Sequence, residues 1–270
     1  GSDFNWPYSL VVDRKGIYYD PSRPSELEDI CNAMPEHPDH TALLERAAAL
    51  RALILDKGLT KYNTGFRTAL PTELPEGKTI VLVPGQVEDD ASVRCGGFGM
   101  TNLDVLRAAR EARPDAFIIY KPHPDVESGN RQGAIPEATA LRYADSLLQD
   151  FPMGRLLPLV HEVHTLTSQT GFEALLRGVR VFTYGGPFYA GWGLTQDRQA
   201  FPRRKAHLTL DELVAGALLL YPSYYDWQTG NFCRAEDVCC RLLQPDGQMR
   251  GRVWARLLAA TRGFLRRISR

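Results

Sequence analysis

Short apolar runs alternate with helical patterns through most of the chain after residue 78. Residues 79–83 and 116–120 have the apolar pattern of buried strands, and residues 162–168 and 179–183 also predict strands. Three segments between them carry apolar side chains at helical spacing: residues 102–111, 136–148 and 172–177. This alternation predicts an α/β fold built on a doubly wound parallel sheet.

The segment before the first of these strands has a different pattern. Residues 9–20 contain two short apolar runs around a glycine and predict a β-hairpin. Ser25, followed three residues later by a glutamate, is expected to cap a helix. Residues 41–56 have the spacing of a long amphipathic helix, and residues 71–77 are expected to link it to the sheet.

Polar side chains gather where the predicted strands end. Residues 116–120 run into Lys121 and His123, which alternate with prolines that lack an N–H for a strand ladder. Ligands of open α/β sheets bind at the carboxyl ends of the strands. Lys121 and His123 are therefore candidates for holding a phosphate or a carboxylate, although a histidine after a strand is more often structural.

An acidic loop, residues 84–92, follows the first predicted strand and contains Glu88, Asp89 and Asp90. Solvated loop acids are the default interpretation. A catalytic carboxylate here would act as a nucleophile on an anomeric carbon or as a base for an acceptor hydroxyl. Ligation of magnesium is a third option, and we do not predict a metal site, because no second acidic cluster lies nearby in the sequence.

A third strand end leads into a helix. Ser168, Gln169 and Thr170 lie at its start, where unpaired N–H groups favour an anion, unless Ser168 is an ordinary helix cap. Glu173 in the first turn would accept hydrogen bonds from ribose hydroxyls, or merely complement the helix dipole. One cationic loop, one acidic loop and one hydroxyl-rich helix start suit a sugar nucleotide better than a metal or nucleic acid.

Composition and charge narrow the function. Lys plus Arg and Asp plus Glu both number 32, so no net field favours nucleic acid as a partner. The five cysteines lack the paired spacing of a disulfide or zinc framework, and no signal peptide is visible, which predicts a cytoplasmic protein. Residues 247–270 hold seven Arg and no acid among apolar side chains. They could lie on an anionic membrane surface, or form a solvated or packed helix.

Residues 184–195 are too rich in glycine for a regular element and too aromatic for a solvated linker. We interpret them as a binding loop. Tyr189 and Trp192 are expected to contact a sugar as part of a lid over the site.

Several long motifs resemble the KpsC family of bacterial capsule polysaccharide proteins. They are Gln-Val-Glu-Asp-Asp-Ala-Ser at residues 86–92, Tyr-Lys-Pro-His-Pro-Asp-Val at 120–126, Glu-Val-His-Thr at 162–165, Gly-Phe-Glu-Ala-Leu-Leu-Arg-Gly at 171–178 and Pro-Phe-Tyr-Ala-Gly-Trp-Gly-Leu-Thr at 187–195. The similarity runs from Ser9 to about Asp226. KpsC proteins carry two transferase modules, and the chain resembles the second, C-terminal module more.

The resemblance implies a retaining glycosyltransferase of the GT-B type that uses no metal or other cofactor. Its donor would be CMP-Kdo, the activated form of an acidic sugar. Its acceptor would be a growing Kdo linker on a lipid of the lyso-phosphatidylglycerol type, which anchors capsule polysaccharide. Such a protein would work in the cytoplasm, at the inner-membrane surface.

The resemblance also implies roles for individual residues. The family pattern Gln-x-x-x-Asp-x-Ser, in which the acid is the nucleophile, falls on three residues: Gln86, Asp90 and Ser92. The family His-Pro pair falls on His123 and Pro124, which would bind CMP, and Ser168 would bind its phosphate. Lys121 or Arg94 would pair with the carboxylate of the sugar.

A GT-B enzyme has two Rossmann-like halves, and one complete half is visible in the sequence. We expect residues 79–232 to form the CMP-sugar-binding domain, residues 1–78 to be part of the acceptor-side half, and residues 233–270 to form a basic helical tail. Other functions stay open at this point: a transferase for another CMP-activated acidic sugar such as sialic acid, a sugar-nucleotide epimerase, or a non-catalytic module for capsule assembly.

Overall fold

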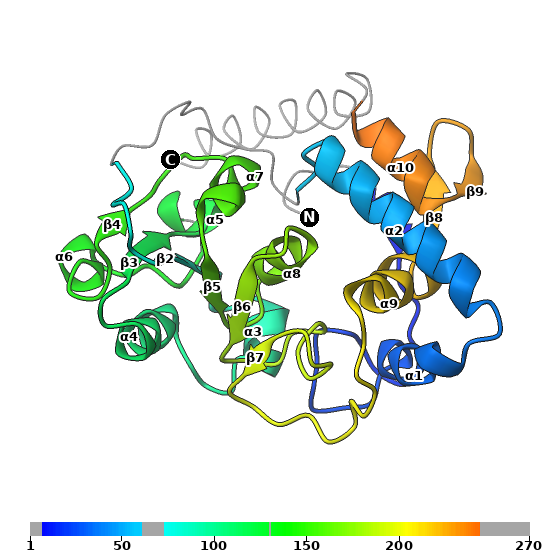
Figure 1. Ribbon diagram of the computed structural model, residues 1–270, viewed down its shortest axis with the longest axis horizontal. Helices are drawn as coiled ribbons and strands as arrows, with labels where there is room; N and C mark the ends of the chain where they lie inside the picture. Colours follow the sequence, from blue (N-terminus) through cyan, green and yellow to red (C-terminus); the bar gives the residue numbers. More distant parts are fainter. Residues whose placement is uncertain (1–6, 61–72, 130, 244–270) are drawn as a thin grey trace, which may run out of the picture.

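The computed structural model describes residues 7–60, 73–129 and 131–243. Six strands form the central sheet (Figure 1): β2 (Ile80–Pro84), β3 (Phe117–Lys121), β4 (Ser146–Leu147), β5 (Glu162–Thr165), β6 (Arg180–Thr183) and β7 (Gln196–Asp197). Every neighbouring pair is parallel, which confirms the predicted α/β fold. The edge strands β4 and β7 have two residues each, too few to give an apolar signal in the sequence.

The strand order in this sheet is β4-β3-β2-β5-β6-β7. The chain adds β3 and β4 on one side of β2, then crosses over and adds β5, β6 and β7 on the other side. The direction of winding therefore reverses between β2 and β5. This pair is the topological switch point, where the loops after the strands diverge and open α/β sheets bind their ligands.

Alternate side chains of the strands fill two separate cores. Ile80 and Leu82 of β2 face one core, whereas Val81 and Val83 face the other, as the two-residue period of a strand requires. The first core joins the sheet to α7 (Met153–Leu156), to α8 (Gln169–Leu176) and to the layer of helices described in the next paragraph. The second core joins the sheet to three other helices: α3 (Ala91–Gly96), α4 (Asn102–Ala112) and α6 (Glu137–Ala140).

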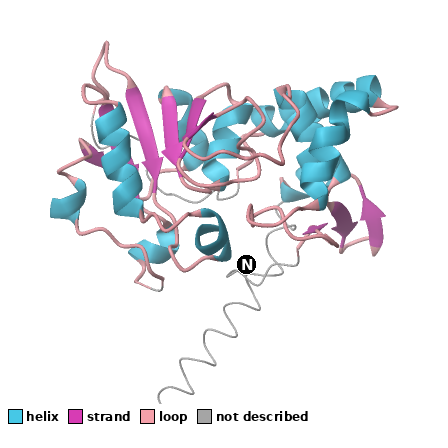
Figure 2. Ribbon diagram, turned by 90° about the horizontal axis from the view of Figure 1, so that it is seen from below, coloured by secondary structure: helices cyan, strands magenta, loops and turns pink. Residues whose placement is uncertain are grey.

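A layer of helices beside the sheet combines segments from both ends of the chain (Figures 1 and 2). It contains α1 (Glu26–Ala33), the 3₁₀ turn η1 (Met34–Glu36), α2 (His40–Asp56), α9 (Leu210–Val214), the π-helical turn η3 (Ala215–Leu220) and α10 (Ala235–Leu242). α2 packs against α9, η3 and α10. Segments that we predicted as separate units, before residue 79 and after residue 232, thus pack against each other. None of the described helices is long and apolar enough to cross a bilayer.

The predicted hairpin at residues 9–20 is wrong, because its first strand pairs elsewhere. β1 (Ser9–Leu10) lies antiparallel to β8 (Ser223–Asp226), which in turn pairs with β9 (Asn231–Cys233). The segment that follows β1 is a turn, in which the carboxylate of Asp13 accepts the N–H groups of Lys15 and Gly16, both at 2.9 Å. A partner strand more than two hundred residues away leaves no trace in the local sequence.

The helix predicted over residues 136–148 is also wrong in its length. Only α6 is helical there, and the chain then turns and joins the edge of the sheet as β4. The carboxylate of Asp145 accepts the N–H of Ile118 at 2.8 Å and thereby ties this segment to β3. The helices expected near Ser25 and at residues 41–56 are confirmed, with the Ser25 hydroxyl accepting the Glu28 N–H at 3.2 Å. The basic segment 247–270 lies outside the described residues.

Candidate functional site

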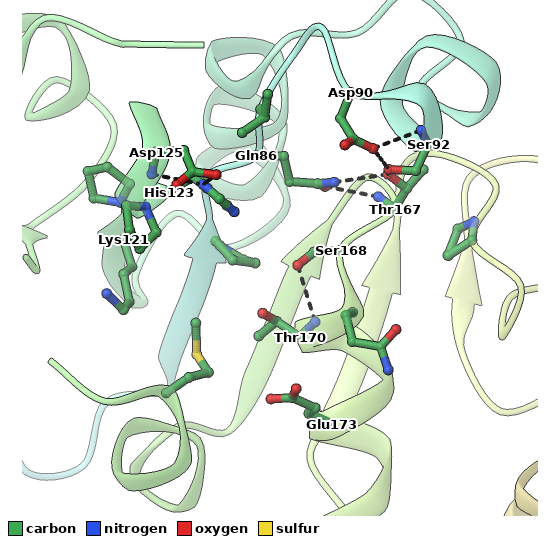
Figure 3. A pocket seen from close by; sticks show the side chains of 18 of the residues that line it. Gln86, Asp90, Ser92, Lys121, His123, Asp125, Thr167, Ser168, Thr170 and Glu173 are labelled. Atoms are coloured by element: carbon green, nitrogen blue, oxygen red, sulfur yellow. Dashed lines mark hydrogen bonds and ion pairs between the residues drawn. The ribbon is translucent and has the colours of Figure 1, made fainter. Parts of the chain in front are cut away.

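A cavity of about 420 Å³ opens at the switch point of the sheet (Figure 3). All of the residues predicted to act in catalysis or to bind CMP line it: Gln86, Asp90, Ser92, Lys121, His123, Pro124, Ser168, Gln169 and Glu173. They come from the carboxyl ends of β2, β3 and β5 and from the segments that follow them, which meet because the three strands are parallel neighbours. The three residues predicted to contact the sugar lie elsewhere: Arg94, Tyr189 and Trp192.

Asp90 caps the short helix α3 (Ala91–Gly96) at the edge of this cavity. Its Oδ1 accepts hydrogen bonds from the Ser92 N–H at 3.0 Å and from the Ser92 hydroxyl at 2.8 Å. Aspartate is a preferred residue at such a cap, which explains why α3 begins here. Two donors on one carboxylate oxygen fix the orientation of the group, as a positioned nucleophile or base requires.

Gln86 connects the ends of β2 and β5. Its Nε2 donates to Thr167 Oγ1 at 2.9 Å, while its Oε1 accepts the Thr167 N–H at 3.0 Å and the Thr165 hydroxyl at 3.3 Å. The backbone N–H of Gln86 donates to Asn102 Oδ1 at 2.9 Å. Both polar atoms of the side chain are engaged within the protein, so Gln86 holds in place the loops that carry Asp90 and Ser168.

Lys121 ends β3 and is only 8% exposed. Burial lowers the pKa of its ammonium group, while the charges of Glu127 and Asp150 act in the opposite direction. None of the described residues forms a hydrogen bond or an ion pair with Nζ of Lys121. A buried cation that lacks such a partner in the protein favours an anionic ligand.

His123 caps the short helix α5 (Pro124–Glu127). Its Nδ1 accepts the N–H of Asp125 at 3.2 Å, and Pro124 occupies the first helical position, where no N–H is needed. With Nδ1 accepting, a neutral imidazole carries its proton on Nε2, which is then the hydrogen-bond donor of the ring. The two prolines around His123 thus serve a tight strand-to-helix turn at the cavity.

The start of α8 forms another part of the cavity wall. Ser168 caps this helix, with its hydroxyl accepting the Thr170 N–H at 3.2 Å. Gln169 and Thr170, in the first turn, line the cavity, so the positive end of the helix dipole lies beside it. Glu173, 7% exposed, follows one turn further along the same wall (Figure 3).

Residues 184–195 are a fixed wall of the cavity, and the expected sugar contacts of Tyr189 and Trp192 are wrong. Both side chains are 0% exposed and belong to the core. The Tyr189 hydroxyl donates to the carbonyl oxygen of Ser168 at 2.6 Å, and Trp192 Nε1 donates to that of Phe188 at 2.8 Å. Phe188 is the aromatic residue of this loop that lines the cavity.

A buried arginine fixes this loop from behind. Nη1 of Arg204 donates to the carbonyl oxygens of Pro187 at 2.6 Å and Ala190 at 2.7 Å. Its Nε donates to Oε1 of Glu28 at 3.0 Å. Burial lowers the pKa of Arg204, and the carboxylate of Glu28, which belongs to α1, opposes that shift. The helical layer therefore helps to shape the cavity wall.

The structure also identifies cavity residues that we did not assign from sequence. Arg94 is exposed on α3, outside the cavity lining, whereas Arg131 lines it. Arg131 follows the His-Pro motif by only a few residues in the chain, and this short separation is the feature of the sequence that could have placed it at the cavity. Tyr18 and Tyr19 also line the cavity, but they precede the sheet by some sixty residues, and no local pattern places them there.

The fold is thus that of an α/β protein with a parallel sheet, whose switch-point cavity combines a buried cation, a helix start and an oriented carboxylate. The family model described as "Capsule polysaccharide biosynthesis protein" matches residues 4–232. The chain belongs to this family.

Relatives with curated descriptions fit this family. The chain is 48% identical over 248 residues to the capsule polysaccharide modification protein LipA of Neisseria meningitidis serogroup A, covering 90% of this chain and 34% of LipA. It is 42% identical over 243 residues to the lipopolysaccharide-processing protein LpsZ of Rhizobium meliloti, covering 90% of this chain and 55% of LpsZ. The chain thus spans about a third of LipA and about half of LpsZ.

Two solved structures are similar to the chain over most of its length. Thermosulfurimonas dismutans KpsC, beta Kdo 2,7 transferase, matches with a TM-score of 0.74 and 41% identity, covering 88% of this chain and 73% of that one. The beta Kdo 2,4 transferase of the same KpsC matches with a TM-score of 0.75 and 36% identity, covering 88% and 74%. The resemblance to KpsC found in the sequence motifs is therefore confirmed.

Proposed function

We propose that the chain carries the donor-binding and nucleophile-bearing part of a retaining β-Kdo glycosyltransferase of the GT-B type. The observation that carries this proposal is the arrangement around one cavity: a carboxylate oriented by two donors at one side, and a helix start, a histidine and a buried lysine at the others (Figure 3). The Kdo transferases named among the structural neighbours support the same chemistry.

The anion-binding side would hold the CMP of the donor. The phosphate would lie at the start of α8, where the N–H groups of the first turn and the Ser168 hydroxyl are close. His123 and Lys121 would neutralise the negative charge that grows on the phosphate as CMP leaves. Glu173, further along α8, would accept hydrogen bonds from the ribose hydroxyls. No metal ion takes part in this proposed step.

Asp90 would be the nucleophile. One of its carboxylate oxygens attacks the anomeric carbon of the sugar, and the bond from that carbon to the CMP phosphate oxygen breaks, with its electron pair leaving on CMP. The acceptor hydroxyl then attacks the same carbon and gives up its proton to solvent, while the bond from that carbon to Asp90 breaks and releases Asp90 as a carboxylate. Each displacement inverts the anomeric centre, so the two together retain its configuration.

The acceptor in this proposal is a Kdo-terminated glycolipid of the lyso-phosphatidylglycerol type, at the cytoplasmic surface of the inner membrane. Capsule polysaccharide biosynthesis is the setting of the family, and LipA is described as a capsule polysaccharide modification protein. The acceptor-side half would come from a part of the protein beyond the chain, because the chain covers only a fraction of its relatives.

The test replaces Asp90 with Asn, which keeps a good helix cap but is a poor nucleophile. Transfer of Kdo from freshly generated CMP-Kdo to a synthetic Kdo-terminated acceptor is measured in the longest form of the protein that contains this chain. We expect transfer to fall by about 10³-fold or more. Mass spectrometry of wild type with donor alone should detect a Kdo ester on Asp90, and the variant should lack it.

Asp115 is a matched control, because it is an exposed aspartate just before β3, at the opposite end of that strand from the cavity. Asp115→Asn should transfer like wild type. Full activity of Asp90→Asn would remove Asp90 from the mechanism.

Competition between CMP-Kdo and CMP-sialic acid identifies the sugar that the protein transfers. Both donors carry the same CMP and differ only in the sugar, so any preference between them comes from the sugar-binding part of the cavity.

A further inference from the structure

Arg131 is tethered to the loop that carries the proposed nucleophile. Its Nε donates to both carboxylate oxygens of Asp89, at 3.1 and 3.2 Å, and Asp89 precedes Asp90 in the same loop. Arg131 also lines the cavity. Its two terminal nitrogens, Nη1 and Nη2, form no hydrogen bond or ion pair with any residue that the structure describes. Within the described residues, the guanidinium is therefore anchored through Nε, and the contacts leave Nη1 and Nη2 to face a ligand.

The other candidate cations are less well placed to act near Asp90. Lys121 lies across the cavity from Asp90 (Figure 3). There the negative charges of Glu127 and Asp150 act to raise the pKa of Lys121, against the effect of burial. Arg94 is exposed on α3 and does not line the cavity. Among the described residues that line the cavity, Arg131 is therefore the cation tethered to the loop of the nucleophile.

The chemistry of the proposed donor requires a cation at this place. In an acidic ketose such as Kdo, the carboxylate is bonded to the anomeric carbon itself. When Asp90 is close enough to attack that carbon, the carboxylate lies only one bond further away. A negatively charged nucleophile beside a negatively charged substituent needs a neutralising group, and the planar fork of arginine matches a carboxylate with two parallel hydrogen bonds.

We propose that Arg131 is a specificity-determining residue that binds the carboxylate of the donor sugar through Nη1 and Nη2. Asp89 positions it through Nε. This inference rests on the proposed function and assigns to Arg131 the role that the sequence led us to expect of Lys121 or Arg94. It explains how one cavity separates the two anions of the donor, with the phosphate at the start of α8 and the carboxylate at the loop after β2.

The test compares donors with and without the carboxylate charge. Equilibrium binding of CMP, CMP-Kdo and the C1-carboxamide of CMP-Kdo is measured on an Asp90→Asn parent, so that the donor is not consumed. The parent should bind the carboxylate donor about 10- to 100-fold more tightly than the carboxamide. Arg131→Gln in this parent should abolish that preference and leave the affinity for CMP unchanged. Arg131→Lys keeps the charge without the fork and should retain part of the preference.

Arg107 provides a matched control, since it is an exposed arginine of α4 that pairs with Asp104 and lies outside the cavity lining. Arg107→Gln should keep the full preference. An Arg131→Gln variant that still prefers the carboxylate would overturn the role of Arg131. A parent that binds CMP-Kdo but does not distinguish the carboxamide would also overturn it, and would leave the proposed function standing. A parent that binds neither CMP nor CMP-Kdo would overturn both.

Discussion

Gln86 illustrates how a motif residue can act on the site through its neighbours. Its side chain is 8% exposed and bonds to the backbone and hydroxyl of Thr167 and to the hydroxyl of Thr165. Thr167 Oγ1 in turn lies 3.5 Å from the hydroxyl of Ser92, which donates to Asp90. We therefore interpret Gln86 as a positioning residue.

Replacing Gln86 with Leu should destabilise the fold and slow transfer together. The half-buried N–H of Thr167 and the buried hydroxyl of Thr165 would lose their acceptor, which costs about 1–3 kcal/mol in the free energy of unfolding. Urea denaturation measures that loss. Gln86→Glu keeps an acceptor and loses the Nε2 donor, so its loss should be smaller. Gln196→Leu, at an exposed position of β7, is the control and should change little. An unchanged free energy of unfolding in Gln86→Leu would contradict this interpretation.

The site could be predicted from sequence where its residues lie directly after strands. Lys121, His123 and Ser168 lie at the carboxyl ends of apolar runs, and the parallel sheet brings such ends together. Tyr189 and Trp192 could not be assigned in the same way. Glycines and aromatic side chains in one loop are compatible with either a ligand-binding lid or a buried wall, and only tertiary packing distinguishes the two.

The start of α8 and the loop after β6 are fitted to each other through Gly171. A Cβ at this position would clash with the Tyr189 hydroxyl and lie 2.7 Å from the Cζ of the same ring. The hydroxyl also holds the carbonyl oxygen of Ser168. A side chain at residue 171 therefore has to displace either the helix start that forms the anion site or the loop that forms the cavity wall.

Gly171→Ala should lower the free energy of unfolding by about 1–3 kcal/mol and weaken CMP binding, because overpacking of this contact moves the helix start. Thermal unfolding and titration with CMP measure the two effects. Gly154→Ala in α7 is the control, since a Cβ there would come no closer than 3.2 Å to its nearest neighbour, Thr60. Unchanged CMP binding in Gly171→Ala would show that the loop yields and the anion site does not depend on this fit.

Contacts between residues far apart in the chain could not be predicted from the sequence, even where the individual helices and strands could. β2 and β3 were predictable because strands buried on both faces are nearly continuous apolar runs, and β5 and β6 were predictable because they are rich in β-branched side chains. The β1–β8 pair was not, since its register depends on residues from opposite ends of the chain. The same holds for the contact of α2 with α9 and α10, which joins segments that look independent in the sequence.

Charged side chains are arranged differently at the two ends of the sheet. At the carboxyl end, Lys121 forms no hydrogen bond or ion pair with any of the described residues. At the amino end, by contrast, the charged side chains form a cluster of ion pairs. Glu162, at the start of β5, pairs with Arg113 at the end of α4 and with Arg180 at the start of β6, both at 2.8 Å. His164 Nε2 lies 3.2 Å from the same carboxylate. The cluster ties the two strands and a helix together away from the cavity.

This cluster predicts how the stability of the whole molecule depends on pH. Burial alone raises the pKa of Glu162, but the hydrogen bonds and charges of His164 and Arg113 outweigh it and lower the pKa to about 2. Burial lowers the pKa of His164, against the opposing effect of Glu162. In both cases the unfolded chain binds more protons than the folded one, so the free energy of unfolding falls as the pH falls. The loss begins near pH 6.5 through His164 and continues from about pH 4.5 to 2 through Glu162.

Urea denaturation at a series of pH values separates the two contributions. Wild type should lose on the order of 2–3 kcal/mol between about pH 4.5 and 2 through Glu162 alone. Glu162→Gln removes that titrating group, so its free energy of unfolding should be lower at neutral pH and should depend less on pH in this range. Glu137→Gln, at an exposed glutamate of α6, should keep the slope of wild type. An equal slope in Glu162→Gln and wild type would mean that other carboxylates control the acid transition, and that the amino end of the sheet is held by packing.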